Sequence, residues 1–312
     1  MFLVCGEALF DLFGVGETAS GGMRLDARMG GSPFNVAIGM ARLGQRAALL
    51  TGISTDAFGV RLAEALGREG VSTHYLLRSG RRTTLSVVAL DPSGSPSYAF
   101  YGVGSSDASI TEADLPSLGA DVTGLHLGSY SIAVPPVADA FAALAERERD
   151  RFIALDPNVR PSVEPDMAVW RRRIDALRRH ADLIKVSEED IAALHPGEDP
   201  ERVATAWTAA GAMAVVLTRG GDEVVVWRGA DVLRLMPPPV TVADTVGAGD
   251  AFQAALLSSL AADGDPGAVL RNASAERLHA ILERAARAAS LTCQRVGADL
   301  PRAAELDVEL VN

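Results

Sequence analysis

The chain has 312 residues, 48% of them hydrophobic and 22% charged, and carries a formal net charge of −11 with a pI of about 5.0. An acidic chain without a basic run excludes nucleic acid and anionic membranes as expected partners, and the apolar runs are shorter than the roughly 20 residues of a membrane helix. The apolar N-terminus lacks the basic residues of a signal peptide and is interrupted by Glu7 and Asp11. Two cysteines, Cys5 and Cys293, cannot form a disulfide framework and have no metal-ligand spacing, so we expect a cytoplasmic protein.

Short apolar runs alternate with amphipathic stretches, a pattern typical of a largely parallel sheet covered by helices. In chain order we expect strand 2–6, helix 32–43, strand 47–50, a helix from 56 to 67, strand 124–127, helix 137–146, strand 152–155, helix 167–180, strand 183–186, helix 200–210, strand 214–217, helix 250–262 and helix 275–293. Ser32 is predicted to be the N-cap of the first helix, with Pro33 in its first turn and Gly44 at its end.

Two segments do not fit this alternation. Residues 12–29 are rich in glycine and polar residues, and residues 83–101 alternate around a DPSGSP turn, which predicts an antiparallel hairpin. A small β-sheet standing off the main sheet would accommodate both, and ordinary surface loops would do so equally well. With the first interpretation, residues 1–312 form one α/β domain with a lid from about 12–29 and 83–104.

The most informative motif is DTVGAGDAF at 244–252, where a glycine-rich turn leads into a helix. Gly247 and Gly249 allow a close backbone approach and are expected to adopt a positive φ. The N–H groups of Gly247, Ala248 and Gly249 at a helix N-terminus can bind phosphate without a cation. Asp250 would repel that phosphate, which makes sense if it serves as a general base. The alternative is an aspartate cap in a glycine turn. A dinucleotide fingerprint is disfavoured, because phenylalanine occupies the place of its third glycine.

Three further segments carry candidate ligands. Asn35 in GGSPFN could bind a polyol, and Asp11 follows the first strand, where open α/β sheets bind ligands. Arg160 in DPNVR could hold an anionic oxygen. Each also has an ordinary interpretation: an exposed asparagine, a loop carboxylate and a surface arginine. Lys185 is the single lysine among 29 basic residues, and the absence of G-x-x-x-x-G-K-[ST] means that ATP would be bound without a Walker loop.

GGSPFNVA near the N-terminus and DTVGAGDAF near the C-terminus, in this order over nearly the whole chain, resemble the ribokinase/PfkB sugar kinases. GEALFDL, DPNVR and IKVSEED are most similar to the fructokinase branch. The resemblance implies a ribokinase-like α/β fold with a mainly parallel central sheet flanked by helices and a small β-sheet lid. It implies that Asp250 is the catalytic base and that the turn at 247–249 is the anion hole. The lid would close over the sugar and form the contact of a homodimer.

The resemblance also implies the ligand positions. The sugar would be contacted by Asp11, Gly30, Gly31, Asn35, Phe100, Arg160 and Asp250, and Arg160 could also meet the phosphoryl group. The nucleotide would be contacted by Lys185, Ser187, Thr218, Gly220, Gly221, Gly247, Gly249 and Ala289. Asp190 would hold Mg²⁺ through water, and a monovalent cation such as K⁺ would lie among Asp244, Val246, Arg295 and Gly297. The chain departs from the family pattern at Ser54, Ser187, Asp190 and Ala286.

We therefore expect an ATP- and Mg²⁺-dependent kinase that phosphorylates a primary sugar hydroxyl, with fructose as the first candidate. A 2-keto-3-deoxygluconate kinase, a ribokinase and a nucleoside kinase of the same family are the alternatives. The stretch 98–107 contains no cation, which favours a neutral sugar over a sugar acid. An alternative of another class is a non-catalytic sugar-binding or regulatory relative. Such a protein is expected to lose the base or the anion-hole glycines, which this chain retains.

Overall fold

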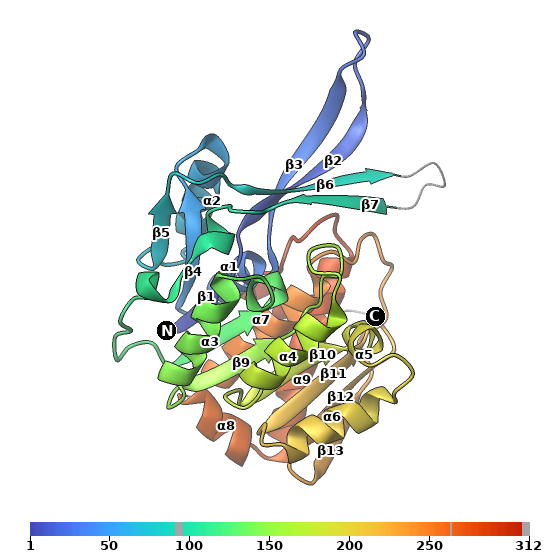
Figure 1. The fold of residues 1–312 in the computed structure, drawn as a ribbon. Coiled ribbons are helices and arrows are strands. Elements are labelled where there is room, and N and C mark those ends of the chain that lie inside the picture. Colours follow the sequence, from blue (N-terminus) through green and yellow to red (C-terminus); the bar gives the residue numbers. More distant parts are fainter. Residues whose placement is uncertain (91–95, 263, 308–312) are drawn as a thin grey trace.

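The computed structural model describes residues 1–90, 96–262 and 264–307. Within these residues the central layer is a nine-stranded sheet of order β13-β12-β11-β10-β9-β8-β1-β4-β5 (Figure 1). Its strands are β1 (Phe2–Cys5), β4 (Ala47–Ser54), β5 (Leu76–Ser79), β8 (Gly124–Gly128), β9 (Phe152–Asp156), β10 (Leu183–Ser187), β11 (Ala214–Arg219), β12 (Glu223–Arg228) and β13 (Asp231–Leu235). Neighbours pair in parallel, except that β12 is antiparallel to both β11 and β13. The predicted mainly parallel sheet is confirmed.

Helices cover both faces of this sheet. One face carries α1 (Ser32–Arg42), α2 (Ala57–Arg68), α7 (Ala248–Ala261), α8 (Pro266–Asn272), α9 (Ala275–Cys293) and α10 (Ala303–Leu306); the other carries α3 (Val137–Arg147), α4 (Met167–Leu177), α5 (Glu188–Leu194) and α6 (Pro200–Ala209). In β1, Phe2 and Val4 enter the first core, whereas Leu3 and Cys5 enter the second. Strands buried on both faces are apolar throughout, which explains why the sequence shows apolar runs here.

A second, four-stranded sheet of order β3-β2-β6-β7 stands off the body (Figure 1). Its strands are β2 (Leu9–Glu17), β3 (Met23–Gly30), β6 (Thr84–Leu90) and β7 (Pro96–Tyr101). β2 pairs with β3 and, in parallel, with β6, so the two unusual segments of the sequence form one sheet, as expected. The predicted DPSGSP turn at 91–96 lies, apart from its last residue, outside the described residues.

The ends of several elements differ from the predictions. The N-cap of α1 is Gly31, not Ser32, and no side chain caps this helix because the Ser32 hydroxyl is bound elsewhere. Helix α7 begins at Ala248, two residues before the predicted start. Strands β5, β12 and β13 and helices α5, α8 and α10 were not predicted. All of them except the buried β12 are short or half-exposed, and such elements carry little periodicity. None of the described helices is both long and apolar enough to cross a membrane.

Candidate active site

Asp250 is held at the start of α7 by two side chains of α1. Its Oδ1 accepts a hydrogen bond of 2.6 Å from the Ser32 hydroxyl, and its Oδ2 accepts one of 2.8 Å from the Asn35 amide. Only 8% of Asp250 is exposed. Helices α1 and α7 pack against each other, so the carboxylate has a fixed orientation. The GGSPFN and GAGD motifs, over 200 residues apart in the sequence, therefore meet at one carboxylate.

The turn at 247–249, which we call the anion-hole turn, has the predicted positive φ at Gly247 but not at Gly249, which already lies within α7. Gly247 is the N-cap of α7 in the left-handed conformation, with φ of 81°. A Cβ there would also lie 2.7 Å from the Cβ of Ala298, so both the backbone conformation and the lack of space require glycine. Among the described residues, the N–H groups of Gly247 and Gly249 have no acceptor, whereas that of Ala248 donates to the Thr245 carbonyl over 3.2 Å. Two of the three predicted phosphate donors are thus directly available.

Lys185 lies beneath this turn. Its ammonium is 3.0 Å from Oδ2 of Asp156, and both side chains are almost completely buried. Burial raises the pKa of Asp156 to about 6, although the charge of Lys185 opposes this rise. The ammonium also lies against Gly249, where an added Cβ would be 3.1 Å from Nζ. The predicted nucleotide ligand Lys185 is therefore below the anion-hole turn and not on an open surface.

The predicted sugar-binding residues gather where the smaller sheet joins α1. The carboxylate of Asp11 lies against Gly30, at which a Cβ would come within 2.5 Å of Oδ2. Burial raises the pKa of Asp11, while a hydrogen bond from Ser86 and the charge of Arg160 lower it. Gly30 leads through Gly31 directly into α1. This connection places Asp11, Gly30, Gly31 and Asn35 in a continuous strip that ends at Asp250.

Phe100 and Arg160, which are also predicted to contact the sugar, have different surroundings. The half-buried Phe100 ring packs edge-on against Tyr130, with centroids 5.0 Å apart. Arg160 is exposed, and its guanidinium donates to the Val159 carbonyl over 3.1 Å. It is close enough to Asp11 for its charge to favour the ionised carboxylate. Arg160 therefore keeps donors for a ligand beside Asp11.

Two buried acids near this strip were not identified as site residues from the sequence. Glu7 is 1% exposed and accepts a hydrogen bond from the Ser131 hydroxyl; burial raises its pKa to about 7, against the effect of that bond. Asp107 accepts hydrogen bonds from Thr84, Ser105 and Tyr130. Thr84 begins β6 and Ser105 follows β7, so Asp107 fastens the base of the smaller sheet to the body. From the sequence, Asp107 stands out only as the one charged residue of the stretch 98–107.

The predicted nucleotide-side residues lie at the carboxyl ends of β10 and β11. Ser187 and Thr218 are partners in the register of these strands, and Gly220 and Gly221 follow in the turn to β12. Ser187 and Asp190 form a capping box at the start of α5, and Oδ1 of Asp190 also accepts from the Val159 N–H over 2.7 Å. Ala289 is half-buried on α9. No cluster of three or more metal-ligating side chains occurs in the described ranges.

Asp244 connects the anion-hole turn to the loop after α9. Its Oδ1 accepts from the N–H of Val246 over 3.1 Å, and its Oδ2 accepts from the N–H of Gly297 over 2.8 Å. Arg295 in the same loop forms ion pairs with Glu305 and Asp299. The structure therefore brings together the four residues predicted around a monovalent cation, although the Asp244 carboxylate already has two backbone donors.

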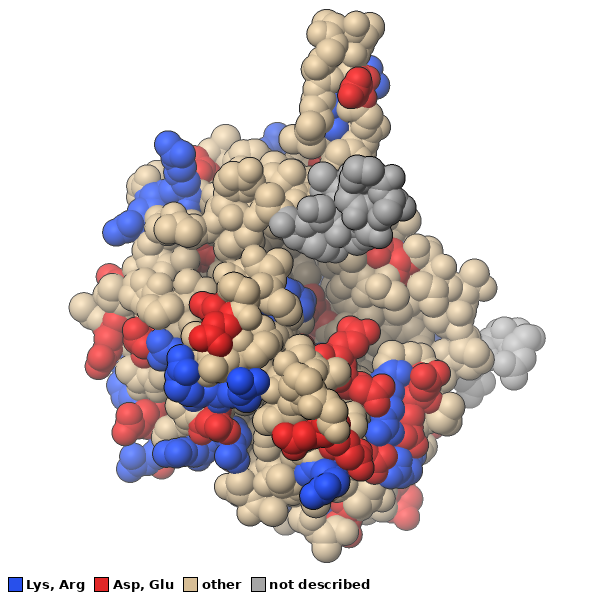
Figure 2. Space-filling view, turned by 45° about the vertical axis from the view of Figure 1, so that its right-hand side comes forward, with Lys and Arg blue, Asp and Glu red and all other residues tan. Residues whose placement is uncertain are grey.

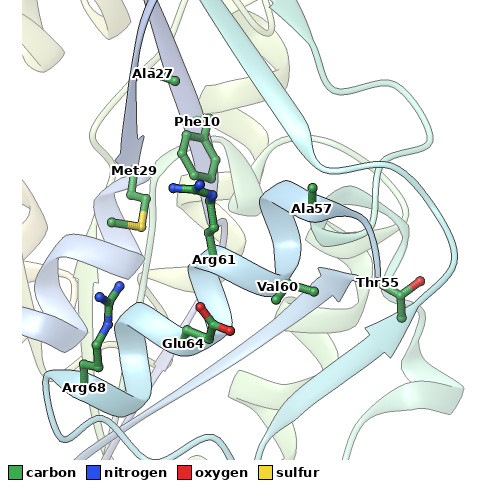
Figure 3. A pocket seen from close by; sticks show the side chains of 9 residues that line it. All are labelled: Phe10, Ala27, Met29, Thr55, Ala57, Val60, Arg61, Glu64 and Arg68. Carbon is green, nitrogen blue, oxygen red and sulfur yellow. The ribbon is translucent and has the colours of Figure 1, made fainter.

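A pocket of about 620 Å³ lies on the side of β2 that faces away from the candidate site (Figure 3). It is lined by Phe10, Ala27, Met29, Thr55, Ala57, Val60, Arg61, Glu64 and Arg68. Successive side chains of a strand point to opposite faces, so Phe10 faces this pocket and Asp11 faces away from it. The candidate site lies instead on the body side of the smaller sheet, where Figure 2 shows the surface hollowed.

A fixed carboxylate lies beside free amides at a helix N-terminus, next to side chains that can hydrogen-bond to hydroxyl groups. This arrangement is suited to the transfer of an anionic group to a hydroxyl. The model of the pfkB family carbohydrate kinases matches residues 1–304, and the chain belongs to this family. The predicted family and fold are thus confirmed, and the protein is a sugar kinase.

The relatives and the solved structures agree with this assignment. A fructokinase of Rhizobium leguminosarum bv. trifolii is 37% identical over 264 residues, which cover 84% of this chain and 80% of that protein. A fructokinase of Salmonella typhimurium is 33% identical over 84% of this chain and 85% of its own length. The crystal structure of a Xylella fastidiosa fructokinase with bound ATP has a TM-score of 0.88 at 26% identity, covering 98% of this chain and 96% of that one.

Proposed function

We propose that this kinase transfers the γ-phosphate of ATP to the primary hydroxyl of D-fructose, giving fructose 6-phosphate and ADP. The observation that carries the proposal is the Asp250 carboxylate, fixed by Ser32 and Asn35 next to the anion-hole turn. The names of the relatives support fructose, and the structure of the Xylella fastidiosa fructokinase with ATP supports the nucleotide.

In the proposed reaction, Asp250 accepts the proton of the sugar hydroxyl as its oxygen attacks the γ-phosphorus in line. Ser32 and Asn35 each donate to a different oxygen of the Asp250 carboxylate. Each oxygen keeps a further lone pair that can accept the proton. The free N–H groups of Gly247 and Gly249 stabilise negative charge on the transferred group. Loss of such a base typically lowers the rate by about 10²–10⁴-fold.

The residues present fit Mg²⁺ carried by the nucleotide better than Mg²⁺ in a cage of protein ligands. Oδ1 of Asp190 accepts one described hydrogen bond, from Val159, and so keeps a lone pair for a metal-bound water. Mg²⁺ commonly binds through one or two carboxylates together with phosphates and waters. When bound, it neutralises charge on the β- and γ-phosphates.

The sugar is proposed to lie along the strip from Asp11 to Asn35. The carboxylate of Asp11 accepts hydrogen bonds from sugar hydroxyls, the Asn35 amide and the glycine backbone allow close contact, and the Phe100 ring covers the sugar. Arg160 also makes a sugar acid such as 2-keto-3-deoxygluconate a second candidate, because its guanidinium lies beside Asp11. The carboxylate of Asp11 favours the neutral sugar.

We propose that the smaller sheet acts as a lid, which excludes water and so limits ATP hydrolysis. Its exposed Val15, Met23 and Leu25 support a second role as the contact of a homodimer. Figure 2 shows that the projecting part of this sheet carries few charges. Size-exclusion chromatography with light scattering tests the dimer: Met23→Glu should give a monomer if the contact is real and no change if it is not.

Unpaired Cys5 and Cys293 support action in the reducing cytoplasm.

We also propose that K⁺ promotes activity by binding near Asp244. A Vibrio cholerae fructokinase was solved with fructose, ADP and a potassium ion, at 26% identity and a TM-score of 0.81. The Asp244 carboxylate joins Val246 to Gly297 directly beside Gly247, so a cation here would order the anion-hole turn. Replacing KCl by tetramethylammonium chloride at equal ionic strength should lower kcat, whereas an unchanged kcat would exclude the cation.

A coupled ADP-release assay tests the substrate directly. The wild-type protein is assayed with fructose, ribose, 2-keto-3-deoxygluconate and adenosine, and the phosphorylated product is identified by mass spectrometry. We expect the highest kcat/KM with fructose. A higher value for another member of the panel would replace fructose as the substrate, and binding without turnover of all four would favour a non-catalytic relative.

A further inference from the structure

Lys185 occupies a position that its surroundings specify closely. It lies on β10 beside Asp156 at the end of β9, and these neighbouring strands run in parallel. Its neighbours Ile184 and Val186 belong to the core against α4–α6, so the Lys185 side chain points to the other face, toward the first turn of α7. Only 4% of Lys185 is exposed, and its ammonium forms a 3.0 Å ion pair with Asp156.

The ammonium is in contact with the anion-hole turn. A Cβ added at Gly249 would lie 3.1 Å from Nζ, which is tighter than an ordinary van der Waals contact. Unlike Gly247, Gly249 lies within α7 and has no left-handed φ. A side chain at the second glycine of this turn would therefore crowd the ammonium of Lys185, whereas the backbone conformation there does not require glycine.

The charges around Lys185 make it the counter-ion of a cluster of acids. Burial lowers its pKa, but the charges of Asp156, Asp190 and Asp250 outweigh that effect and raise the pKa overall. Oδ1 of Asp156 is buried without a hydrogen-bond partner among the described residues, so this carboxylate depends on Lys185 for compensation. The nearby His126 adds no positive charge, because burial and the charge of Lys185 lower its pKa to about 3.

We propose that Lys185 is a positioning residue for phosphoryl transfer: its buried ammonium fixes the Gly249 end of the anion-hole turn over Asp156 and keeps a positive charge beneath the transferred phosphate and Asp250. This role rests on the assignments of Asp250 and the turn made above. It gives a reason for the one lysine of the chain to be here, because its compact ammonium lies between Asp156 and Gly249, whereas a guanidinium is larger and planar.

The proposal is tested by steady-state kinetics of Lys185→Met, Lys185→Arg and a matched control, Arg151→Met. The control removes a part-buried cation from the amino end of β9, where Arg151 pairs with Glu148. We expect both Lys185 variants to lower kcat by about 10–100-fold, approaching the effect of a lost oxyanion donor, with the KM for sugar within about threefold. The control should keep kcat within about twofold. Equal losses in Lys185→Met and Arg151→Met, or wild-type kcat in a folded Lys185→Met, would overturn the proposal.

Two further readouts separate positioning from structural support. The acidic limb of the kcat–pH profile should move to higher pH in Lys185→Met, because the acids around the ammonium lose a nearby positive charge. The limb should move to lower pH in Asp156→Asn, which removes a negative charge. This second variant keeps the test possible even if Lys185→Met does not fold. Unmoved limbs in the folded variants would refute the electrostatic role.

Gly249→Ala tests the contact itself. The added methyl group would push against the ammonium. In the double variant with Lys185→Met, the loss of kcat should therefore be clearly less than the product of the two single losses. Independent, multiplicative effects would contradict the proposed contact. All variants are assayed with whichever sugar the wild-type protein phosphorylates, so failure with fructose would change the substrate proposal and leave this test intact.

Discussion

Glu7 gives a prediction whose magnitude follows from its burial. Burial raises the pKa of this carboxyl from 4.5 to about 7, and the charge of Asp107 adds to the rise, while bonds from Ser131 and Ser129 oppose it. Because the raised pKa belongs to the folded state, the folded protein holds this proton more tightly than the unfolded chain does. The associated stability is fully present below pH 4.5 and is lost as the pH rises through 7. At about 1.4 kcal/mol for each pKa unit, the loss is about 3 kcal/mol.

Replacing Glu7 by glutamine keeps the shape and removes the titration. Urea unfolding of the wild type and of Glu7→Gln is measured at pH 5, 6, 7 and 8. We expect the variant to gain stability relative to the wild type by about 2–3 kcal/mol across this range, because only the wild type must bury an ionising carboxyl. The titrations of Asp156 and His126 occur in both proteins and cancel in the difference. A difference that stays constant from pH 5 to pH 8 would refute the reasoning.

Three further substitutions test the site. Gly247→Ala should lower kcat by about 10²-fold, because it disturbs the anion-hole turn. The control Gly44→Ala has a similar φ of 83° and open space around it, so it should lower only the stability. Equal losses of kcat in the two variants would contradict this prediction. Asn35→Ala should lower kcat/KM by about tenfold, a value set by one hydrogen bond to a charged group, and an unchanged kcat/KM would show that this bond does not orient Asp250. Phe100→Ala should raise the KM for sugar several-fold by uncovering it, measured at saturating ATP, and an unchanged KM would place Phe100 away from the sugar.

Much of the fold could be predicted because the central strands are buried on both faces. Strands such as β1 and β10 appear as apolar runs, and a long amphipathic helix such as α9 has the predicted ends. The edge strand β13 was missed because it is half-exposed and combines apolar with charged residues. Its neighbour β12 was missed although its central residues are apolar and buried. The two segments of the smaller sheet could be recognised as unusual, but their pairing through β2 and β6 depends on contacts between distant parts of the chain.

The candidate site was only partly visible in the sequence. Motifs that contain glycine could be identified, because glycine marks the turn at 247–249 and the entry to α1. The sequence could not show that Ser32 binds Asp250 instead of capping its own helix, since both are ordinary roles of a serine hydroxyl. Nor could it show the burial of Glu7 and Asp107, because a single carboxylate in a loop has the same sequence pattern whether it is exposed or buried.

The central claim is that Asp250 is the base of a phosphoryl transfer to a sugar hydroxyl. The most direct measurement is the rate of sugar phosphorylation by Asp250→Asn, which preserves the shape of the side chain and its contact with Ser32. We expect a loss of about 10²–10⁴-fold in kcat, with the affinity for sugar, measured by calorimetry, within a few-fold of the wild type. Turnover at the wild-type rate by this variant would contradict the account.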